Sequence, residues 1–118
     1  MKVLIVEAGG QLGQIWADHM RRIGAQVNVA DSESAAVEYL RANEFEILVL
    51  SMECDDGAAI SVADYASYRR PDMKVVFVSA SSFFSDGSVF SYMSNACAMV
   101  PPATNPDDLA ALVEYHAR

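Results

Sequence analysis

Five positions with the potential to form one functional site each follow a short run of apolar residues, where a buried strand would end. They are Glu7, Ala8, Ser51, Ser79 and Pro101. The carboxyl ends of parallel strands meet at one edge of an open α/β sheet, and ligands bind there. One carboxylate is a poor ligand set for Mg²⁺, and a serine hydroxyl without an adjacent base is a weak nucleophile. The set therefore predicts no metal site and no catalytic centre.

A second group of residues has the spacing of a nucleotide-binding loop. Gly9, Gly10 and Gly13 follow the first apolar run, and Asp31 stands 18 positions after Gly13, at the end of the second run. Glycines at such a turn let a pyrophosphate approach the N–H groups that begin a helix, and an acid at this distance binds ribose in dinucleotide-binding domains. The alternative hypothesis is a nucleotide- or dinucleotide-binding Rossmann-like domain.

Three features weaken that alternative. Ala8 stands where the first glycine of the fingerprint belongs, and the charged Glu7 stands where the phosphate loop would begin. A chain of 118 residues also leaves no room for a separate substrate domain. The favoured interpretation is that Gly9 and Gly10 shape a turn into the first helix and that Asp31 is a helix-cap or turn residue.

The elements that must position these residues alternate regularly along the chain. Five segments rich in Val, Ile and Leu predict strands that are buried on both faces: Lys2–Val6, Gln26–Ala30, Glu46–Ser51, Lys74–Ser79 and Cys97–Val100. Longer amphipathic segments separate them, which is typical of repeated βα units. The sequence predicts one domain over residues 1–118, with a doubly wound five-stranded parallel sheet in a three-layer α/β/α arrangement.

Helices are predicted from apolar residues at three- and four-residue steps and from their end signals. The first has its apolar face at Leu12, Ile15, Trp16, His19, Met20 and Ile23 and ends at Gly24. His19 is interpreted as a half-buried packing residue. The second buries Ala36, Val37 and Leu40, with Ser32 or Ser34 as N-cap.

Three further helical segments are weaker or are marked mainly by their ends. A helix over Ile60–Tyr68 stops before Pro71, and residues 81–95 predict a short or frayed helix because they are rich in Ser. The last helix has Thr104 or Asn105 as cap and Pro106 in its first turn. Its inward residues are Leu109, Leu112 and Val113.

Composition narrows the range of partners and compartments. The chain has 16 acidic and 8 basic residues and a formal net charge of −8, which repels nucleic acid and anionic lipid. The pairs Arg21-Arg22 and Arg69-Arg70 stand at predicted helix ends, where they complement the helix dipole. Cys54 and Cys97 lack CxxC spacing, and no export signal or membrane span is evident. We expect a soluble cytoplasmic protein with free thiols that binds neither nucleic acid nor membrane.

The spacing of the strand-end positions over all 118 residues resembles the receiver domain of bacterial two-component response regulators. The resemblance implies a CheY-like fold with strand order 2-1-3-4-5. In that family two acids after the first strand and an Asp ending the third hold Mg²⁺, and the Asp takes a phosphoryl group from a histidine kinase. A Ser or Thr after the fourth strand and a Lys before a Pro after the fifth contact the phosphoryl oxygens.

Little of this set is kept. Glu7 matches the first acid and Ser79 matches the hydroxyl, but Ala8, Ser51 and Pro101 replace the second acid, the acceptor Asp and the Lys, with Pro102 as the family's proline. The only two lysines, Lys2 and Lys74, stand at strand starts, on the opposite edge. The acids Glu53, Asp55 and Asp56 are interpreted as a solvated loop, although a shift of this loop toward the site is the open alternative. A role of Ser51 as phosphoacceptor receives little weight.

The resemblance implies a degenerate receiver, or pseudo-receiver, that acts in signal transduction by binding and is not an enzyme. We expect no cofactor, and a protein partner such as a histidine kinase, a phosphotransfer protein or another regulator, or a homodimer. Receivers present the face of the fourth helix, fifth strand and last helix to partners. On it the chain places Phe83, Phe84, Phe90, Tyr92 and Met93. The family's switch aromatic in the fifth strand is replaced by Ala98.

Overall fold

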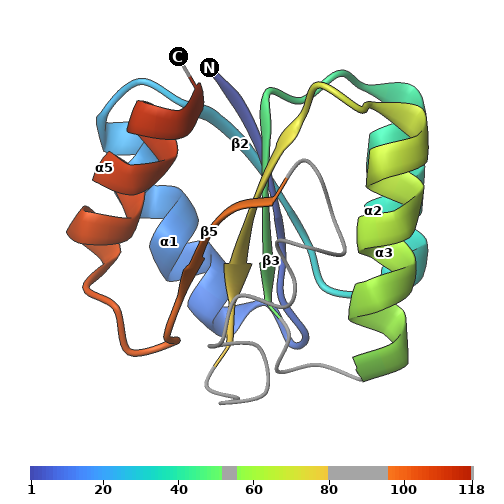
Figure 1. Cartoon of the computed structure of the whole chain (residues 1–118). Coiled ribbons are helices and arrows are strands. Elements are labelled where there is room, and N and C mark those ends of the chain that lie inside the picture. Colours follow the sequence, from blue (N-terminus) through green and yellow to red (C-terminus); the bar gives the residue numbers. More distant parts are fainter. Residues whose placement is uncertain (52–55, 80–95, 118) are drawn as a thin grey trace.

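The described part of the chain forms a parallel sheet between two pairs of helices. The structure, a computed structural model, describes residues 1–51, 56–79 and 96–117 (Figure 1). Its five strands are all parallel and lie in the order β2-β1-β3-β4-β5. Their bounds are β1 Lys2–Val6, β2 Gln26–Ala30, β3 Ile47–Ser51, β4 Lys74–Val78 and β5 Ala96–Val100. The predicted fold class and strand order are confirmed.

The strands have the bounds that their apolar runs predict, to within one residue at each end. Glu46 precedes β3 and Ser79 follows β4, while β5 begins one residue earlier than expected, at Ala96. The prediction of burial on both faces holds best for β3, in which all five residues are buried. It fails for β2 and β5, which lie at the two edges of the sheet and contain half-buried residues.

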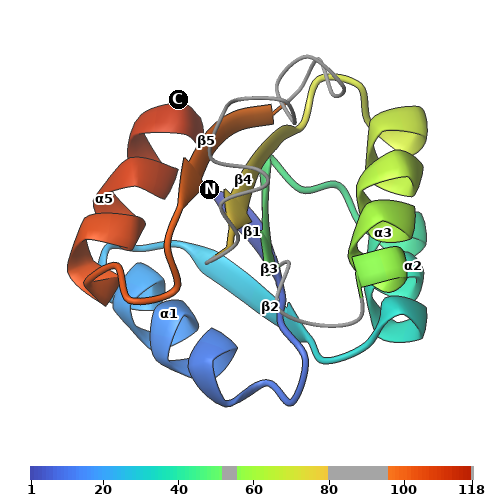
Figure 2. The same cartoon turned by 60° about the horizontal axis from the view of Figure 1, so that its bottom comes forward.

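Helices cover each face of the sheet in pairs. The described helices are α1 Gln11–Arg22, α2 Glu33–Ala42, α3 Asp56–Arg69 and α5 Pro106–Ala117. Figure 2 shows α1 and α5 on one face and α2 and α3 on the other. Each pair seals a separate apolar cluster against the sheet, with Trp16 and Met20 under α1 and Leu40 and Ala66 under α2 and α3. The core is therefore two layers, divided by the strands.

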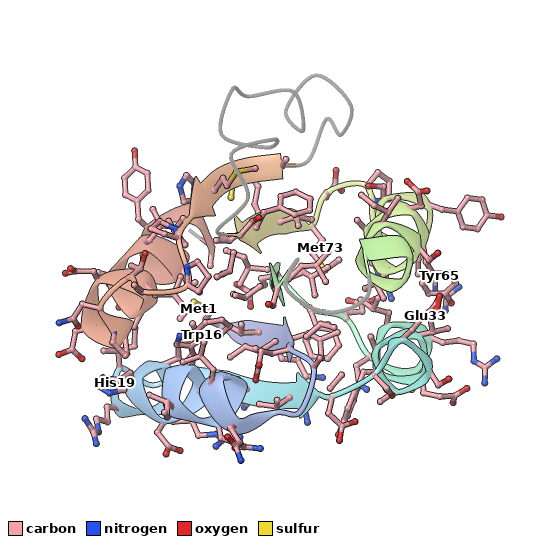
Figure 3. All side chains as sticks on the ribbon, turned by 90° about the horizontal axis from the view of Figure 1, so that it is seen from below. Met1, Trp16, His19, Glu33, Tyr65 and Met73 are labelled. Carbon is pink, nitrogen blue, oxygen red and sulfur yellow. The ribbon has the colours of Figure 1, made fainter. Side chains whose placement is uncertain are left out.

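The predicted apolar face of α1 is partly wrong. Ile15 and Ile23 are 48% and 44% exposed, whereas Gly13 and Ala17 are buried together with Trp16 and Met20. Small residues face the sheet because they let the helix approach it closely, and a pattern based on large apolar side chains misses them. In Figure 3, which views the sheet from the carboxyl ends of its strands, Trp16 lies between α1 and the sheet.

His19 is half-buried, as predicted, and it also has a polar partner. Its Nδ1 lies 2.5 Å from Oδ1 of Asp107, in the first turn of α5, so this contact joins the two helices on one face of the sheet. The outward position of His19 on α1 is visible in Figure 3. The histidine therefore positions α5 against α1.

The helix caps agree with their predicted residues where the sequence offers two choices. Ser32 Oγ accepts a hydrogen bond from the Ala35 N–H at 3.2 Å, and Asn105 Oδ1 accepts one from the Asp107 N–H at 2.9 Å. Thr104 instead donates to the Pro101 carbonyl. Caps of this kind satisfy N–H groups that begin a helix without an intrahelical partner. In the last helix Leu109 and Val113 are buried, as predicted, and Leu112 is half-buried.

The third helix is longer than predicted, and the segment after β4 is outside the described residues. Helix α3 begins at Asp56, before the predicted start at Ile60, and ends at Arg69, two residues before Pro71. Residues 81–95, for which a frayed helix is predicted, are not described. Within the described part of the chain, no helix is long and apolar enough to cross a membrane.

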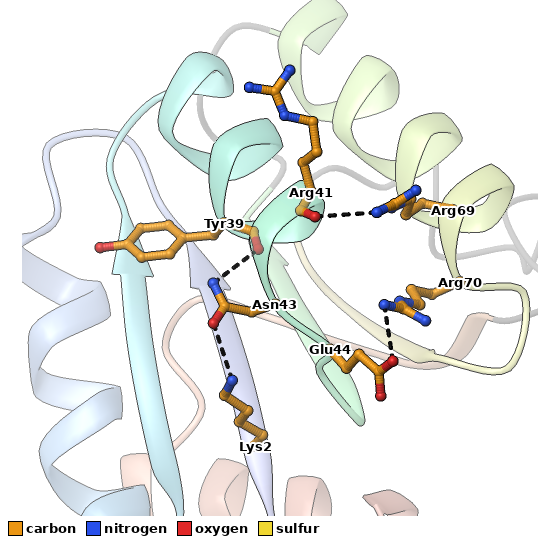
Figure 4. Close-up of polar contacts among 7 residues, drawn as sticks. All are labelled: Lys2, Tyr39, Arg41, Asn43, Glu44, Arg69 and Arg70. Atoms are coloured by element: carbon orange, nitrogen blue, oxygen red, sulfur yellow. Dashed lines mark hydrogen bonds and ion pairs between the residues drawn. The ribbon is translucent and has the colours of Figure 1, made fainter.

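The second arginine pair lies at a helix end, as predicted. Arg69 Nη2 donates to the Arg41 carbonyl, at the end of α2, at 3.1 Å. Arg70 forms an ion pair with Glu44 at 3.2 Å, and both contacts appear in Figure 4. A positive side chain at the carboxyl end of a helix is stabilised by the negative end of its dipole. These contacts support a structural role for the pair.

Candidate functional site

The strand-end positions converge at one edge of the sheet. Ser51 is the last residue of β3, and Glu7 follows Val6, which pairs with Leu50; continuing that register places Glu7 beside Ser51. Ser79 follows β4, and its N–H donates to the Val100 carbonyl at 2.9 Å. Pro101 follows β5 directly. The carboxyl edge of the sheet therefore carries Glu7, Ser51, Ser79 and Pro101 at successive strand ends.

The two serines of this edge are the buried polar residues of the described chain. Ser51 is 3% exposed and Ser79 is 7% exposed, whereas Ala8 and Pro101 are exposed. A hydroxyl is uncharged, so it is buried at a much smaller desolvation penalty than a carboxylate. The residue that ends β3 at the centre of the edge thus has a buried, uncharged side chain.

Glu7 contributes a carboxylate to this edge, and that group already has a partner. Its Oε1 accepts a hydrogen bond from the Gly13 N–H at 2.9 Å, in the first turn of α1. Gly10, the N-cap residue of α1, has no side chain with which to make that bond. A carboxylate at this position also interacts favourably with the positive end of the helix dipole. Glu7 therefore acts as the cap of α1 from outside the helix.

Gly13 lies where α1 approaches the sheet closely. A Cβ atom at this position would meet Val29 Cγ1 at 3.1 Å, Glu7 Cβ at 3.3 Å and Ile5 Cγ2 at 3.4 Å. Contacts this short mean that a Cβ atom at this position would require its neighbours to shift by a few tenths of an ångström. Gly9 and Gly10 have φ of 80° and 75°, in the left-handed region that favours glycine. All three glycines of the nucleotide-binding alternative have a structural reason, as a turn and as a close approach.

Two shallow grooves lie on the described surface. One, of about 410 Å³, is away from this edge, and the second, of about 390 Å³, lies near it. The second groove, between the starts of α1 and α2, is lined by Gly9, Gly10, Gln11, Gln14, Val29, Asp31, Ala35 and Tyr39. It contains three of the four residues of the nucleotide-binding alternative. Asp31 is exposed there, and the carboxylate of Glu7 occupies the anion position at the start of α1. Two carboxylates beside the groove oppose the binding of a pyrophosphate.

Both lysines lie at the opposite edge of the sheet, as predicted. Lys2 and Lys74 are the first residues of β1 and β4. Lys2 Nζ donates to Asn43 Oδ1 at 3.1 Å and lies 5.4 Å from the centroid of the Phe45 ring. Figure 4 shows Lys2 and Asn43 together with the Tyr39 carbonyl, to which Asn43 donates. No lysine of the chain is at the carboxyl edge.

Other predicted site residues are only partly described. Glu53 and Asp55 lie outside the described residues, and Asp56 is described only as the first residue of α3. The predicted partner face, Phe83, Phe84, Phe90, Tyr92 and Met93, also lies outside them. Ala98 is in β5, as expected for the position of the switch aromatic. In the described ranges, no group of three or more His, Cys, Asp or Glu side chains has a spacing suited to a metal ion.

Sequence reasoning missed the contact that organises the edge. The local capping signal is an acid three residues after the N-cap, whereas Glu7 precedes Gly13 by six positions. The two intervening glycines, with their positive φ, return the chain so that these residues meet. An acid two positions before a Gly-Gly pair is the one signal in the sequence for this arrangement.

Comparison with known proteins identifies the fold. No protein-family model matches the chain, and no curated protein gives a significant match. Solved structures do match. A CheY-like response regulator receiver domain protein from Methanospirillum hungatei superposes with a TM-score of 0.84 at 22% identity, covering 98% of this chain and 92% of that one.

Two further similar structures have equally complete coverage. The N-terminal domain of a response regulator/sensory box/GGDEF three-domain protein from Carboxydothermus hydrogenoformans has a TM-score of 0.84 at 22% identity, covering 100% and 94% of the two chains. Response regulator TrrA from Thermotoga maritima, solved in complex with Mg²⁺-BeF, has a TM-score of 0.80 at 19% identity, covering 98% and 97%. The chain has the fold of CheY-like response regulator receiver domains.

Proposed function

We propose that this chain is a signalling module that acts by binding a partner protein and does not use phosphorylation of an aspartate. The observation that carries the proposal is Ser51, which is the last residue of β3 and is 3% exposed. Phosphoryl transfer to a receiver requires a carboxylate nucleophile, a cation and donors for the phosphoryl oxygens. Ser51 offers a hydroxyl where the family has its acceptor carboxylate.

The surroundings of Ser51 support the same proposal. Glu7, the one acid retained from the family's pattern, is hydrogen-bonded to the Gly13 N–H. Ala8 brings no carboxylate, and Pro101 brings no ammonium group to neutralise a phosphoryl group. Mg²⁺ demands near-octahedral oxygen coordination and commonly keeps one or two carboxylate ligands. One engaged carboxylate is a weak basis for such a site.

The proposed partners are those of the fold's signalling proteins: a histidine kinase, a phosphotransfer protein or another regulator. The similar structures are described as response regulators or their receiver domains, and one of them is part of a three-domain protein. Conversion from phosphoacceptor to docking module would keep the scaffold and remove the chemistry. The role is binding and not catalysis.

Incubation with acetyl phosphate and Mg²⁺, followed by intact mass measurement, tests the proposal. We expect no gain of a phosphoryl group under conditions that phosphorylate a conventional receiver run in parallel. Incubation with a phosphohistidine donor protein should give the same result. Stoichiometric phosphorylation of the wild-type chain would contradict the proposal, and Ser51→Ala would then show whether the serine is the acceptor.

The nucleotide-binding alternative separates from this proposal in a thermal melt. A ligand that binds only the native state raises the melting temperature, so NAD or ATP at millimolar concentration would stabilise a nucleotide-binding domain. The carboxylate of Glu7 at the start of α1 predicts no stabilisation. A shift with NAD that Gly10→Val abolishes would replace the interaction-module proposal with the alternative.

A further inference from the structure

The outer edge of β2 presents backbone groups to solvent. At the two ends of this strand, the Gln26 N–H donates to the Met1 carbonyl at 2.9 Å, and the Ala30 carbonyl accepts from the Glu7 N–H at 3.0 Å. In a parallel ladder the peptide groups of successive residues point alternately to the two sides of the strand. Gln26, Asn28 and Ala30 therefore face β1, while Val27 and Val29 direct their N–H and C=O groups outward.

One side chain covers the first half of this edge. Arg21 Nη2, in the last turn of α1, donates to the outward Val27 carbonyl at 2.9 Å. Arg21 is in turn 3.5 Å from Asp18 on the same helix. A charged side chain across an edge strand is a common protection against unwanted strand pairing. The protection ends at Val27, so the peptide groups of Val29 remain open.

The groove of about 390 Å³ lies at this open half. Val29 is part of its lining, with Gln11 and Gln14 contributed by α1 and Ala35 and Tyr39 contributed by α2. The groove thus combines backbone hydrogen-bonding groups, side-chain amides and an aromatic ring. This combination suits an extended peptide, whose backbone pairs with the strand edge while its side chains enter the groove.

We propose that the β2 edge at Val29 binds an extended segment of a partner protein, which adds to the sheet as a further strand and directs a Lys or Arg toward Asp31. Asp31 is an exposed carboxylate in the groove lining, and Glu33, also exposed, begins α2 two residues later. The chain as a whole carries a net charge of −8. This charge favours a basic peptide over a second copy of the same chain.

The inference rests on the proposed role as a protein-interaction module and adds the surface and the chemistry of the partner. The surface differs from the predicted aromatic partner face. The acetyl phosphate assay tests the proposed role as an interaction module and does not depend on the β2 edge. The module proposal and the peptide-binding proposal can therefore fail separately. A peptide-binding defect leaves that assay unchanged.

Selection of displayed linear peptides against the full chain supplies the probe. We expect the selected peptides to have β-branched residues at every second position and to contain a Lys or an Arg. Hydrogen exchange followed by NMR should show that the Val29 amide, which points away from β1, becomes protected when a synthetic copy of a selected peptide is added. Recovery of no binder, or protection confined to other elements, would overturn the proposal.

Val29→Pro is the decisive variant. It removes the outward N–H but no hydrogen bond to β1, and proline is tolerated on edge strands when its N–H would face solvent. We expect Val29→Pro to lower the affinity for the peptide roughly tenfold. Val29→Thr keeps the N–H and should bind the peptide as tightly as wild type. A melting curve checks that the proline variant is folded. Equal affinity of folded Val29→Pro and wild type would overturn the proposal.

Substitutions of charged side chains provide a test that does not alter the strand. Asp31→Asn should weaken binding of the basic peptide and reduce its salt dependence, whereas Asp64→Asn, an exposed acid on α3, should change neither. Arg21→Ala exposes the Val27 carbonyl and should strengthen binding several-fold. If wild type sediments as a dimer that Val29→Pro dissociates, the occupant is a second copy and the partner-peptide proposal is wrong.

Discussion

The carboxylate of Glu7 accepts a hydrogen bond from the Gly13 N–H at 2.9 Å, across the glycine turn that joins β1 to α1. Glu7 thereby satisfies an N–H group at the start of the helix that the N-cap residue, Gly10, has no side chain to reach. In a metal-binding receiver, an acid at this strand end would be available to a cation. Here it accepts the Gly13 hydrogen bond and stabilises the start of α1.

Glu7→Ala is expected to lower the free energy of unfolding by about 1 kcal/mol, the usual effect of removing a helix cap. Glu7→Gln keeps an acceptor oxygen and should lose only the part that comes from the charge, about half as much. Urea denaturation measures both. Glu33→Ala, in the first turn of α2, serves as the control with an expected loss of a few tenths of a kcal/mol. Equal stability of Glu7→Ala and wild type would contradict the capping role.

The strands were predictable because burial on both faces leaves a run of apolar residues with few other interpretations. Val3–Val6 and Ile47–Leu50 are such runs, and both belong to strands whose bounds agree with the prediction to within one residue. The buried face of α1 was not predictable in the same way. Gly13 and Ala17 face the sheet because they are small, and hydrophobic periodicity gives little weight to small residues.

The candidate site was predictable in position and not in its contacts. The strand ends locate Glu7 and Ser51 at one edge, since parallel strands share their direction. The bond from Gly13 to Glu7 and the bond from Arg21 to Val27 depend on where side chains reach in three dimensions. Periodicity and local capping rules carry no information on such contacts, so the open half of the β2 edge emerges only from the structure.

Gly13→Ala should destabilise the protein even though alanine is the better helix former. Alanine adds about 1 kcal/mol of helix propensity. A Cβ atom at this position would, however, meet Val29, Glu7 and Ile5 at 3.1–3.4 Å, and overpacking of this kind costs about 1–3 kcal/mol. We expect a net loss of about 1 kcal/mol in urea denaturation.

The comparison with Glu7 identifies the cause of that loss. A shifted Glu7 would also weaken the Gly13 hydrogen bond, so Gly13→Ala and Glu7→Ala together should destabilise less than the sum of the two changes. Gln14→Ala, one position along the same helix and exposed, is the control and should be neutral or stabilising. A stabilised Gly13→Ala variant would show that the helix moves away from β1 without penalty.

The thiol of Cys97 should react slowly with alkylating agents. Burial raises the pKa of the Cys97 thiol above its ordinary 9.0, and the nearby charge of Lys74 only partly opposes this shift. Because the thiolate is the reactive form, less of it is present at pH 8 than for an unburied cysteine. In a Cys54→Ser variant, the rate of modification by iodoacetamide should keep rising with pH beyond 9.0.

Replacing Lys74, the lysine near this thiol, tests whether its positive charge lowers the pKa of Cys97. Lys74→Gln removes a positive charge that favours the thiolate, so the pKa of Cys97 should rise further and modification at pH 8 should slow. Lys2→Gln, which changes the other lysine, is the matched control and should leave the rate unchanged. Faster modification of Lys74→Gln would mean that the substitution exposes the thiol.

Ala8→Asp combined with Ser51→Asp should create a magnesium site if the two strand ends converge as in a metal-binding receiver. The register that pairs Val6 with Leu50 places position 51 beside Glu7, so three carboxylates would surround one cation. Without metal, the new carboxylates repel each other and Glu7. The carboxylate at position 51 is also buried at a desolvation penalty, because Ser51 is only 3% exposed. The double variant should therefore melt below wild type.

Added Mg²⁺ should reverse this loss in the double variant and leave wild type unchanged. Binding to the native state alone adds about 2.7 kcal/mol of stability when the ion is at 100 times its dissociation constant. Pro101→Lys would be required in addition before phosphorylation could change the conformation, because a receiver uses its lysine to contact the phosphoryl group. Thermal melts with and without Mg²⁺ measure the effect, and Ca²⁺ tests whether the response is specific.

A folded double variant with no metal response would mean that residues 8 and 51 do not share a site, whereas stabilisation of wild type would mean that Glu7 already holds the ion.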